Sequence, residues 1–232
     1  MKPQLASQDD GGFTLIELLV IIAVFAIFLG LFDWGVPPGQ KRKAQHVACI
    51  SNLKQIAITY RLWENDNNNL YPMAVSVTNG GAMEPLASGN VAAGFLVMSN
   101  ELSTPKILWC PADADGVPAA NFSNLNNSNI SYFTGLDITN ETSPQRLLTG
   151  DDNFAIGGVR VKSGLLELST SIAIDWSAGR HHAYNSHFWT PVRDRFVGNI
   201  GLADGSVQQV TTVFLQKAFQ QTGQATNRLA IP

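Results

Sequence analysis

One carboxylate lies in the most apolar part of the chain and sets its clearest chemical requirement. Residues 11–32 read GGFTLIELLVIIAVFAIFLGLF, and Glu17 is the single charged residue among them. A charged side chain at the bilayer centre costs about 2.5–3.5 kcal/mol on insertion scales, and less near the interface. Glu17 therefore needs a cationic partner, such as an amine, or a side chain that extends to the headgroup region.

Three histidines, His181, His182 and His187, have metal-binding side chains, and Asp175 and Asp204 lie near them in the sequence. Zinc requires three or four such ligands that converge, with a second shell that orients them. Their spacing matches no zinc motif, because adjacent histidines point apart on a strand and poorly together on a helix. We expect a solvated polar loop here and no catalytic metal. The chain also has no nucleophile elbow or phosphate-binding loop, so we expect no enzyme.

Asp151 and Asp152 follow Gly150 and precede Asn153, and such a run of oxygen donors is a candidate for calcium. The flanking residues complete no calcium-loop motif, so a solvated turn is the alternative interpretation. We expect no cofactor, and calcium at Asp151 and Asp152 is the one candidate.

The two cysteines, Cys49 and Cys110, fit neither a zinc site nor a CxxC redox motif. They form one disulfide if their domain lies outside the cytoplasm. Buried free thiols are the alternative. The sequence leaves both outcomes open.

The apolar run has the length of a membrane span. As a helix, residues 13–32 would extend about 30 Å, which is the thickness of a bilayer core. A cleaved secretory signal has a shorter apolar region of about 7–15 residues. We therefore expect a retained transmembrane helix over residues 13–34.

The segment GGFTLIELLV resembles the class III signal of type IV pilins and type II secretion pseudopilins. The resemblance implies that residues 1–12 are a leader peptide, which prepilin peptidase removes after Gly12. The same enzyme would then N-methylate Phe13, the new first residue. It also implies that Glu17 pairs with the amine of its own or a neighbouring subunit and so sets the register of a helical filament.

The charge distribution excludes one partner class and raises a question of topology. A net charge of −3 with one short basic cluster, residues 41–43, argues against general nucleic-acid binding. Applied to that cluster, the positive-inside rule would leave the globular part in the cytoplasm. The resemblance implies the opposite orientation, with a cytoplasmic leader. We follow it and expect a single-pass protein of the bacterial inner membrane whose globular domain is periplasmic or extracellular.

A second helix follows a break. Residues 35–39, GVPPG, should interrupt the first helix, because proline lacks the backbone donor and glycine relaxes the backbone. Residues 40–65 then form an amphipathic helix. Its apolar stripe comprises Val47, Ile50, Leu53, Ala57, Tyr60 and Trp63. The resemblance implies a pilin-like α+β fold, in which this helix packs on a small antiparallel sheet.

The remaining chain reads as a globular α+β domain over residues 66–222, with a frayed tail over residues 223–232. Asp204-Gly205 is a favoured two-residue hairpin turn. Further strands are expected at Ile107–Asp113, Ile130–Leu136, Arg146–Thr149, Ser171–Asp175 and Gly198–Ala203. The segments CISNLKQIAITYRLWENDNNNLYP, LWCPAD and NIGLADGSVQQ resemble a prepilin-type subfamily abundant in planctomycete and verrucomicrobial bacteria.

Together these features predict a structural subunit of a pilus-like filament, with a type II secretion pseudopilin as the favoured role. The expected partners are further copies of the chain, prepilin peptidase, the inner-membrane assembly platform, other pseudopilins, and membrane lipid before assembly. Two alternatives stay open. One is a type IV pilin for adhesion, motility or DNA uptake. The other is a membrane-anchored binding or hydrolytic domain that never polymerises.

Overall fold

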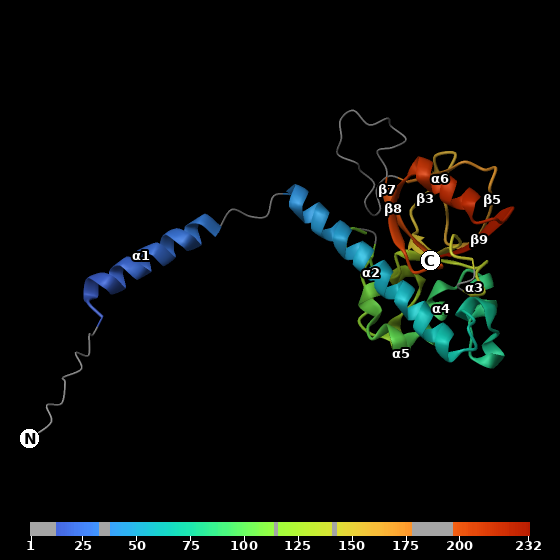
Figure 1. Cartoon of the computed structure of the whole chain (residues 1–232), viewed down its shortest axis with the longest axis horizontal. Coiled ribbons are helices and arrows are strands. Elements are labelled where there is room, and N and C mark those ends of the chain that lie inside the picture. The colour runs from blue at the N-terminus through green and yellow to red at the C-terminus, as the bar shows by residue number, and fades with distance from the viewer. Residues whose placement is uncertain (1–12, 33–37, 114–115, 141–142, 178–196) are drawn as a thin grey trace, which may run out of the picture. The chain divides into compact units, whose positions relative to one another are not determined.

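The computed structural model describes most of the chain, and Figure 1 shows its helices and strands. The described residues are 13–32, 38–113, 116–140, 143–177 and 197–232. The chain divides into two compact units, residues 1–41 and residues 42–232, and each is described by itself. The predicted leader and residues 35–37 of the predicted break lie outside the described residues.

The first unit contains the helix α1, Leu15–Phe32. Apart from Glu17 its residues are apolar, and the side chains of residues 13–30 are all exposed. In the described part of the chain, no helix reaches the combined length and apolarity needed to cross a membrane. The transmembrane helix predicted over residues 13–34 is therefore not confirmed.

The second helix, α2, spans Pro38–Asp66, so the predicted break does not extend to residues 38–39. Proline suits the first turn of a helix, because its missing N–H would have no partner there and its fixed φ is already helical. The helix ends at an asparagine run. Asn67 donates its side-chain amide to the Trp63 carbonyl at 2.8 Å, and Asn68 and Asn69 adopt φ of 58°.

One face of α2 is buried, and it differs in part from the predicted stripe. Its buried apolar residues are Cys49, Leu53, Ile56, Ala57, Tyr60 and Trp63. Val47 was predicted to belong to this face, but it is 66% exposed. The reason is rotational, because Val47 lies about 200° around the helix from Cys49.

Two antiparallel sheets form the rest of the framework. The larger sheet has the order β5-β9-β1-β2-β7-β8 and the smaller one the order β4-β3-β6. The strands of the larger sheet are β1 Tyr132–Gly135, β2 Leu147–Asp151, β5 Gly164–Ser169, β7 Val197–Leu202, β8 Val207–Thr211 and β9 Thr226–Ile231. Those of the smaller sheet are β3 Phe154–Ile156, β4 Val159–Arg160 and β6 Ile174–Trp176. The α+β class with antiparallel sheets is thus confirmed.

Short helices complete the domain; in Figure 1, α6 lies at one side of it and α3, α4 and α5 at the other. The α-helices are α3 Met83–Ala87, α4 Val91–Val97, α5 Ser99–Leu102 and α6 Thr212–Gln221. The 3-10 turns are η1 Pro72–Ala74, η2 Val77–Asn79, η3 Pro105–Leu108, η4 Phe122–Asn124 and η5 Asn127–Asn129. The segment Ile107–Asp113, predicted as a strand, therefore contains the end of η3 instead.

The larger sheet separates two apolar cores, because successive side chains on a strand point to opposite faces. On β1, Tyr132 belongs to the core that includes the buried face of α2. Phe133, the next residue, belongs to the core that includes α6 and the smaller sheet. In that second core Phe154 stacks on Trp176, with ring centroids 5.2 Å apart.

The predicted frayed tail is wrong. Residues 226–231 form β9, which pairs with β5 on one side and β1 on the other. Leu229, Ala230 and Ile231 are buried in this position. The tail is ordered by strand pairing with distant segments, which local sequence does not reveal.

The predicted hairpin is confirmed, since β7 pairs with β8 in antiparallel register. Its connection is longer than two residues, because β7 ends at Leu202 and β8 begins at Val207. Gly205 adopts φ of 82° within it, a conformation that favours glycine. The Asp204 carbonyl also accepts a hydrogen bond from Arg61 of α2 at 3.2 Å.

Candidate functional site

The start of α1 is closed by reciprocal hydrogen bonds between Thr14 and Glu17. The Thr14 backbone N–H donates to Glu17 Oε2 at 2.8 Å, and the Thr14 hydroxyl donates to the same oxygen at 2.7 Å. In return, the Glu17 backbone N–H donates to Thr14 Oγ1 at 3.4 Å. This is a capping box, which satisfies backbone donors that have no partner within the helix.

The capping box was missed in the sequence, although a signal for it is present. A threonine three residues before a glutamate, directly ahead of an apolar run, is the pattern of a capping box. The carboxylate of Glu17 thus has partners within its own chain. Both side chains remain exposed, so a cation that approaches can still reach the carboxylate.

Phe13, the predicted first residue of the processed chain, is 77% exposed and stands beside this box. Gly12, the predicted cleavage position, lies outside the described residues. Phe13 and Glu17 are therefore the parts of the predicted processing and assembly site that the structure places.

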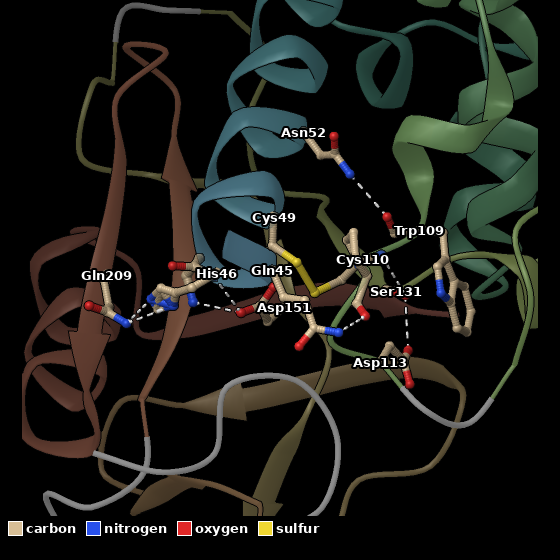
Figure 2. The surroundings of a disulfide bond; sticks show 12 residues. Gln45, His46, Cys49, Asn52, Trp109, Cys110, Asp113, Ser131, Asp151 and Gln209 are labelled. Atoms are coloured by element: carbon tan, nitrogen blue, oxygen red, sulfur yellow. Dashed lines mark hydrogen bonds between the residues drawn. A yellow bond between two sulfur atoms is a disulfide. The ribbon is translucent and has the colours of Figure 1, made fainter. Parts of the chain in front are cut away.

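Cys49 and Cys110 are joined in a disulfide that links α2 to the segment after η3. Both cysteines are fully buried. Two side-chain amides of α2 bond to carbonyls on either side of Cys110, as Figure 2 shows. Gln45 donates to the Pro111 carbonyl at 2.9 Å, and Asn52 donates to the Trp109 carbonyl at 3.0 Å.

A buried hydroxyl group forms further hydrogen bonds with the segment after η3. Ser131 accepts a hydrogen bond from the Cys110 backbone N–H at 3.1 Å and donates its hydroxyl to Asp113 at 2.9 Å. Asp113 is 6% exposed. The disulfide is therefore accompanied by hydrogen bonds that position the same segment.

Asp151 and Asp152, the calcium candidates, are both buried rather than solvated. Asp151 lies on β2 and Asn199 on the adjacent β7. Asn199 donates both its backbone N–H and its side-chain amide to Asp151 Oδ2, at 2.8 and 3.0 Å. The backbone N–H of Asp152 instead donates to the Ser131 carbonyl, at 3.3 Å. Asp151 is thus bonded through its carboxylate, and Asp152 through its backbone N–H.

Burial shifts the pKa of two side chains in this region, His46 of α2 and Tyr132 of β1. Figure 2 shows the His46 ring beside Gln209 of β8, whose side-chain amide lies 3.2 Å from His46 Nδ1. Burial lowers the pKa of His46 from its ordinary value, which favours the neutral imidazole. Burial raises the pKa of the Tyr132 phenol well above its ordinary value, and the negative charge of Asp151 raises it further.

No metal centre emerges from the described residues, since they contain no group of three or more histidine, cysteine, aspartate or glutamate side chains that could hold an ion. His181, His182 and His187 lie outside the described residues. Asp204 stands in the β7–β8 connection, where its carboxylate accepts the Ser206 backbone N–H at 2.8 Å.

One hollow of about 340 Å³ lies where β9 ends and the segment before β5 passes. Its lining includes the basic residues Arg160 and Lys162, the acidic residue Asp152, and Ile231 of β9. No histidine or cysteine lines it. The hollow therefore offers opposite charges together with the hydroxyl of Ser163.

The comparisons with known proteins agree with the N-terminal geometry. Residues 8–32 match the family model described as the prokaryotic N-terminal methylation motif. No curated protein and no solved structure matches the chain, so the predicted subfamily stays a prediction. The motif includes Phe13, the Thr14–Glu17 capping box and α1. The chain accordingly carries the N-terminal signal of type IV pilin and pseudopilin type.

Proposed function

We propose that this chain is a structural subunit of a pilus-like filament, processed after Gly12, methylated at Phe13 and assembled through α1. The observation that carries the proposal is the methylation motif over residues 8–32. It is supported by α1 itself, which apart from Glu17 is apolar and whose side chains up to residue 30 are exposed. A helix that is apolar on every face needs an apolar environment, which the packed helices of a filament provide.

In this proposal Glu17 has two successive partners. In the single chain its carboxylate closes the capping box with Thr14. In the filament it also accepts the amine of Phe13 from a neighbouring copy. Because both capping donors bond to Oε2, the second oxygen is available for that amine. A carboxylate surrounded by apolar helices is stabilised by such a cation far more than it would be in water.

The favoured filament is a type II secretion pseudopilus. Many type IV pilins have a C-terminal pair of cysteines that encloses a loop, whereas both cysteines here are used by the link from Cys49 to Cys110. The partners would then be prepilin peptidase, the inner-membrane assembly platform and other pseudopilins. The subunit is anchored in the inner membrane before assembly, and its domain is exported, where an oxidising compartment preserves the disulfide.

The role proposed for residues 66–232 is to form the filament surface rather than to catalyse a reaction. The hollow beside β5 is lined by no histidine or cysteine. The buried aspartate Asp151 is hydrogen-bonded by Asn199, as expected for a residue that holds strands together. We propose no cofactor, and calcium at Asp151 is tested below.

The first experiment is mass spectrometry of the N-terminal peptide of the membrane-extracted chain. A peptide that begins at Phe13 and is heavier by one methyl group is the expected result. A peptide that still contains the leader would overturn the processing step and would favour a cytoplasmic domain.

The second experiment tests polymerisation separately from processing. Glu17→Val should be cleaved normally but should assemble slowly or not at all, whereas Glu17→Asp should retain partial assembly. Glu167→Val, on the exposed part of β5, is the matched control and should assemble normally. Normal filaments from Glu17→Val would rule out the pairing. A chain that is processed but never forms filaments would instead support the alternative of a membrane-anchored exported domain.

A further inference from the structure

Three residues on one face of α2 bond to three consecutive residues of the segment after η3. Gln45, Cys49 and Asn52 lie four and three positions apart, so they project from the same side of the helix. They contact Pro111, Cys110 and Trp109 respectively, in reverse order along the chain. We call this set of six residues the docking seam. Figure 2 shows its disulfide at the centre and an amide on each side.

The docking seam lies at the point along α2 where its residues first become buried. Residues 43–48 are exposed or half-buried, and Cys49 is the first buried residue of the described part of the helix. Before Cys49, polar contacts of the helix with other segments include Gln45 with Pro111 and His46 with Gln209. Polar contacts at a partly exposed surface contribute little net free energy, because water competes for the same groups.

Beyond the seam, α2 is held by different and stronger means. Leu53, Ile56 and Tyr60 are fully buried, and the Tyr60 hydroxyl shares a hydrogen bond with Thr134 of β1 at 3.0 Å. Burial of each large apolar side chain stabilises by roughly 1.5–3 kcal/mol. The C-terminal half of α2 therefore does not need the disulfide in order to stay on the sheet.

We propose that the docking seam is a redox-dependent latch for the first docked turns of α2. When Cys49 and Cys110 are linked, α2 is seated on the domain from Gln45 onward. When the bond is reduced, residues 44–52 separate from residues 109–113, while the helix from Leu53 onward stays in place. The latch is a property of the fold and does not depend on filament formation.

The chemical step is thiol–disulfide exchange with a small thiol reductant. A thiolate of the reductant attacks one sulfur of the pair and forms a mixed disulfide, and the other cysteine leaves as a thiolate and takes up a proton. A second reductant thiolate releases the remaining cysteine, so two electrons and two protons enter the protein. Because both cysteines are fully buried, the reductant reaches them only after the seam opens transiently.

Hydrogen exchange with mass spectrometry tests the latch on the full chain in detergent. The oxidised protein is compared with Cys49→Ala combined with Cys110→Ala, a change that introduces no new buried polar group. In the variant, amides of residues 44–52 and 109–113 should exchange at least about tenfold faster than those of residues 56–63 and of β1, β2 and β7, a difference that the oxidised protein does not show. Unchanged exchange at residues 44–52 would overturn the latch. Equal protection of the two sets of amides in the variant would also overturn it, because the disulfide would then act only on the stability of the whole domain.

A second variant shows whether the amide of Asn52 belongs to the latch. Asn52→Leu should have little effect on exchange at residues 44–52 while the disulfide is intact, and a larger effect once both cysteines are replaced. Gln55→Leu is the matched control, because Gln55 bonds to Ser51 of its own helix and does not cross the seam. Equal effects of Asn52→Leu in both backgrounds would remove Asn52 from the latch.

Discussion

The backbone N–H and the side-chain amide of Asn199 both donate to one oxygen of Asp151, across the neighbouring strands β7 and β2. Both residues are fully buried. A carboxylate in such a position is stabilised by the donors that surround it, and its loss leaves those donors without an acceptor. This relationship gives Asp151 a structural role that its position after a glycine did not indicate.

Replacement of this carboxylate should therefore destabilise the domain. Asp151→Asn places an amide where Asn199 already presents two donors, so we expect the free energy of unfolding to fall by about 1–3 kcal/mol. Denaturant unfolding measures the change. Asp204→Asn is the control, because an amide oxygen can still accept the exposed Ser206 N–H, and it should change stability by less than about 0.5 kcal/mol. Equal effects from both variants would contradict a specific role for Asp151.

Calcium should not stabilise the protein at this position. Asp151 Oδ2 already accepts two hydrogen bonds from Asn199, and the Asp152 backbone N–H is bonded to the Ser131 carbonyl. Calcium at about 5 mM, which would fill even a weak extracellular site, should leave the melting temperature unchanged. A rise in the melting temperature that Asp151→Asn abolishes would establish a calcium site and would show this expectation to be wrong.

The capping box should determine the order of the first turn of α1. Thr14→Val removes the hydroxyl and should destabilise the helix start by about 1 kcal/mol, whereas Thr14→Ser keeps it. In the detergent-solubilised full chain, the Glu17 amide should exchange about fivefold faster in Thr14→Val and at the original rate in Thr14→Ser. Identical exchange in the two variants would mean that the threonine hydroxyl does not cap the helix.

Removal of the disulfide should lower the stability of the whole domain as well as release the docking seam. The two cysteines are separated by 61 positions. A loop of that size predicts a loss of about 4 kcal/mol from restored freedom of the unfolded chain. Denaturant unfolding of the oxidised chain and of the double alanine variant measures it. A loss below about 1 kcal/mol would indicate that the unfolded chain is already compact around this link.

Gly198 lies against the ring of Trp176, so a side chain at this position should disturb the second core. A Cβ at Gly198 would stand 2.6 Å from the indole, which is itself held by a hydrogen bond from its Nε1 to the Val210 carbonyl at 3.0 Å. We expect Gly198→Ala to cost about 1–3 kcal/mol and to change the near-ultraviolet signal of the tryptophan. Gly201→Ala is the control, since its nearest neighbour is a methyl group of Thr149 at 3.1 Å. A smaller loss at Gly198 than at Gly201 would refute the proposed contact.

Stability should fall in alkaline solution, because the phenols of Tyr60 and Tyr132 are buried. Burial raises the folded-state pKa of Tyr60 above the ordinary value of 10.0, and that of Tyr132 as well. Below pH 10 both states hold the proton and the full stability is present. Above pH 10 the unfolded state ionises first, so stability declines as the pH rises toward the folded-state pKa.

Unfolding experiments at about pH 8 and about pH 11 test whether stability declines as the pH rises. Tyr60→Phe loses the hydrogen bond with Thr134 and should be about 1 kcal/mol less stable at pH 8. Its stability should nevertheless decline less between the two pH values than that of the original chain, because one ionising group has been removed. An equal decline in both proteins would show that Tyr60 is not responsible.

Several local features could be predicted from the sequence because they depend on neighbouring residues. The apolar run and its glutamate identified the methylation motif, which the family match confirms. The three- and four-residue spacing located α2, and Asp204-Gly205 located the β7–β8 hairpin. Each is a signal of helix periodicity or turn chemistry within a few residues, which is what local sequence encodes.

Other features depend on segments far apart in the chain, and only the tertiary structure decided them. β9 is ordered because β5 and β1 flank it, although its own residues resemble a loose tail. The position of the sheet relative to α2 determines that Cys49 belongs to the buried face of the helix and that Val47 does not. The disulfide and the bonds between Asp151 and Asn199 likewise join distant residues. Local patterns determined where helices and turns form, and the packing of distant strands against them determined which side chains meet.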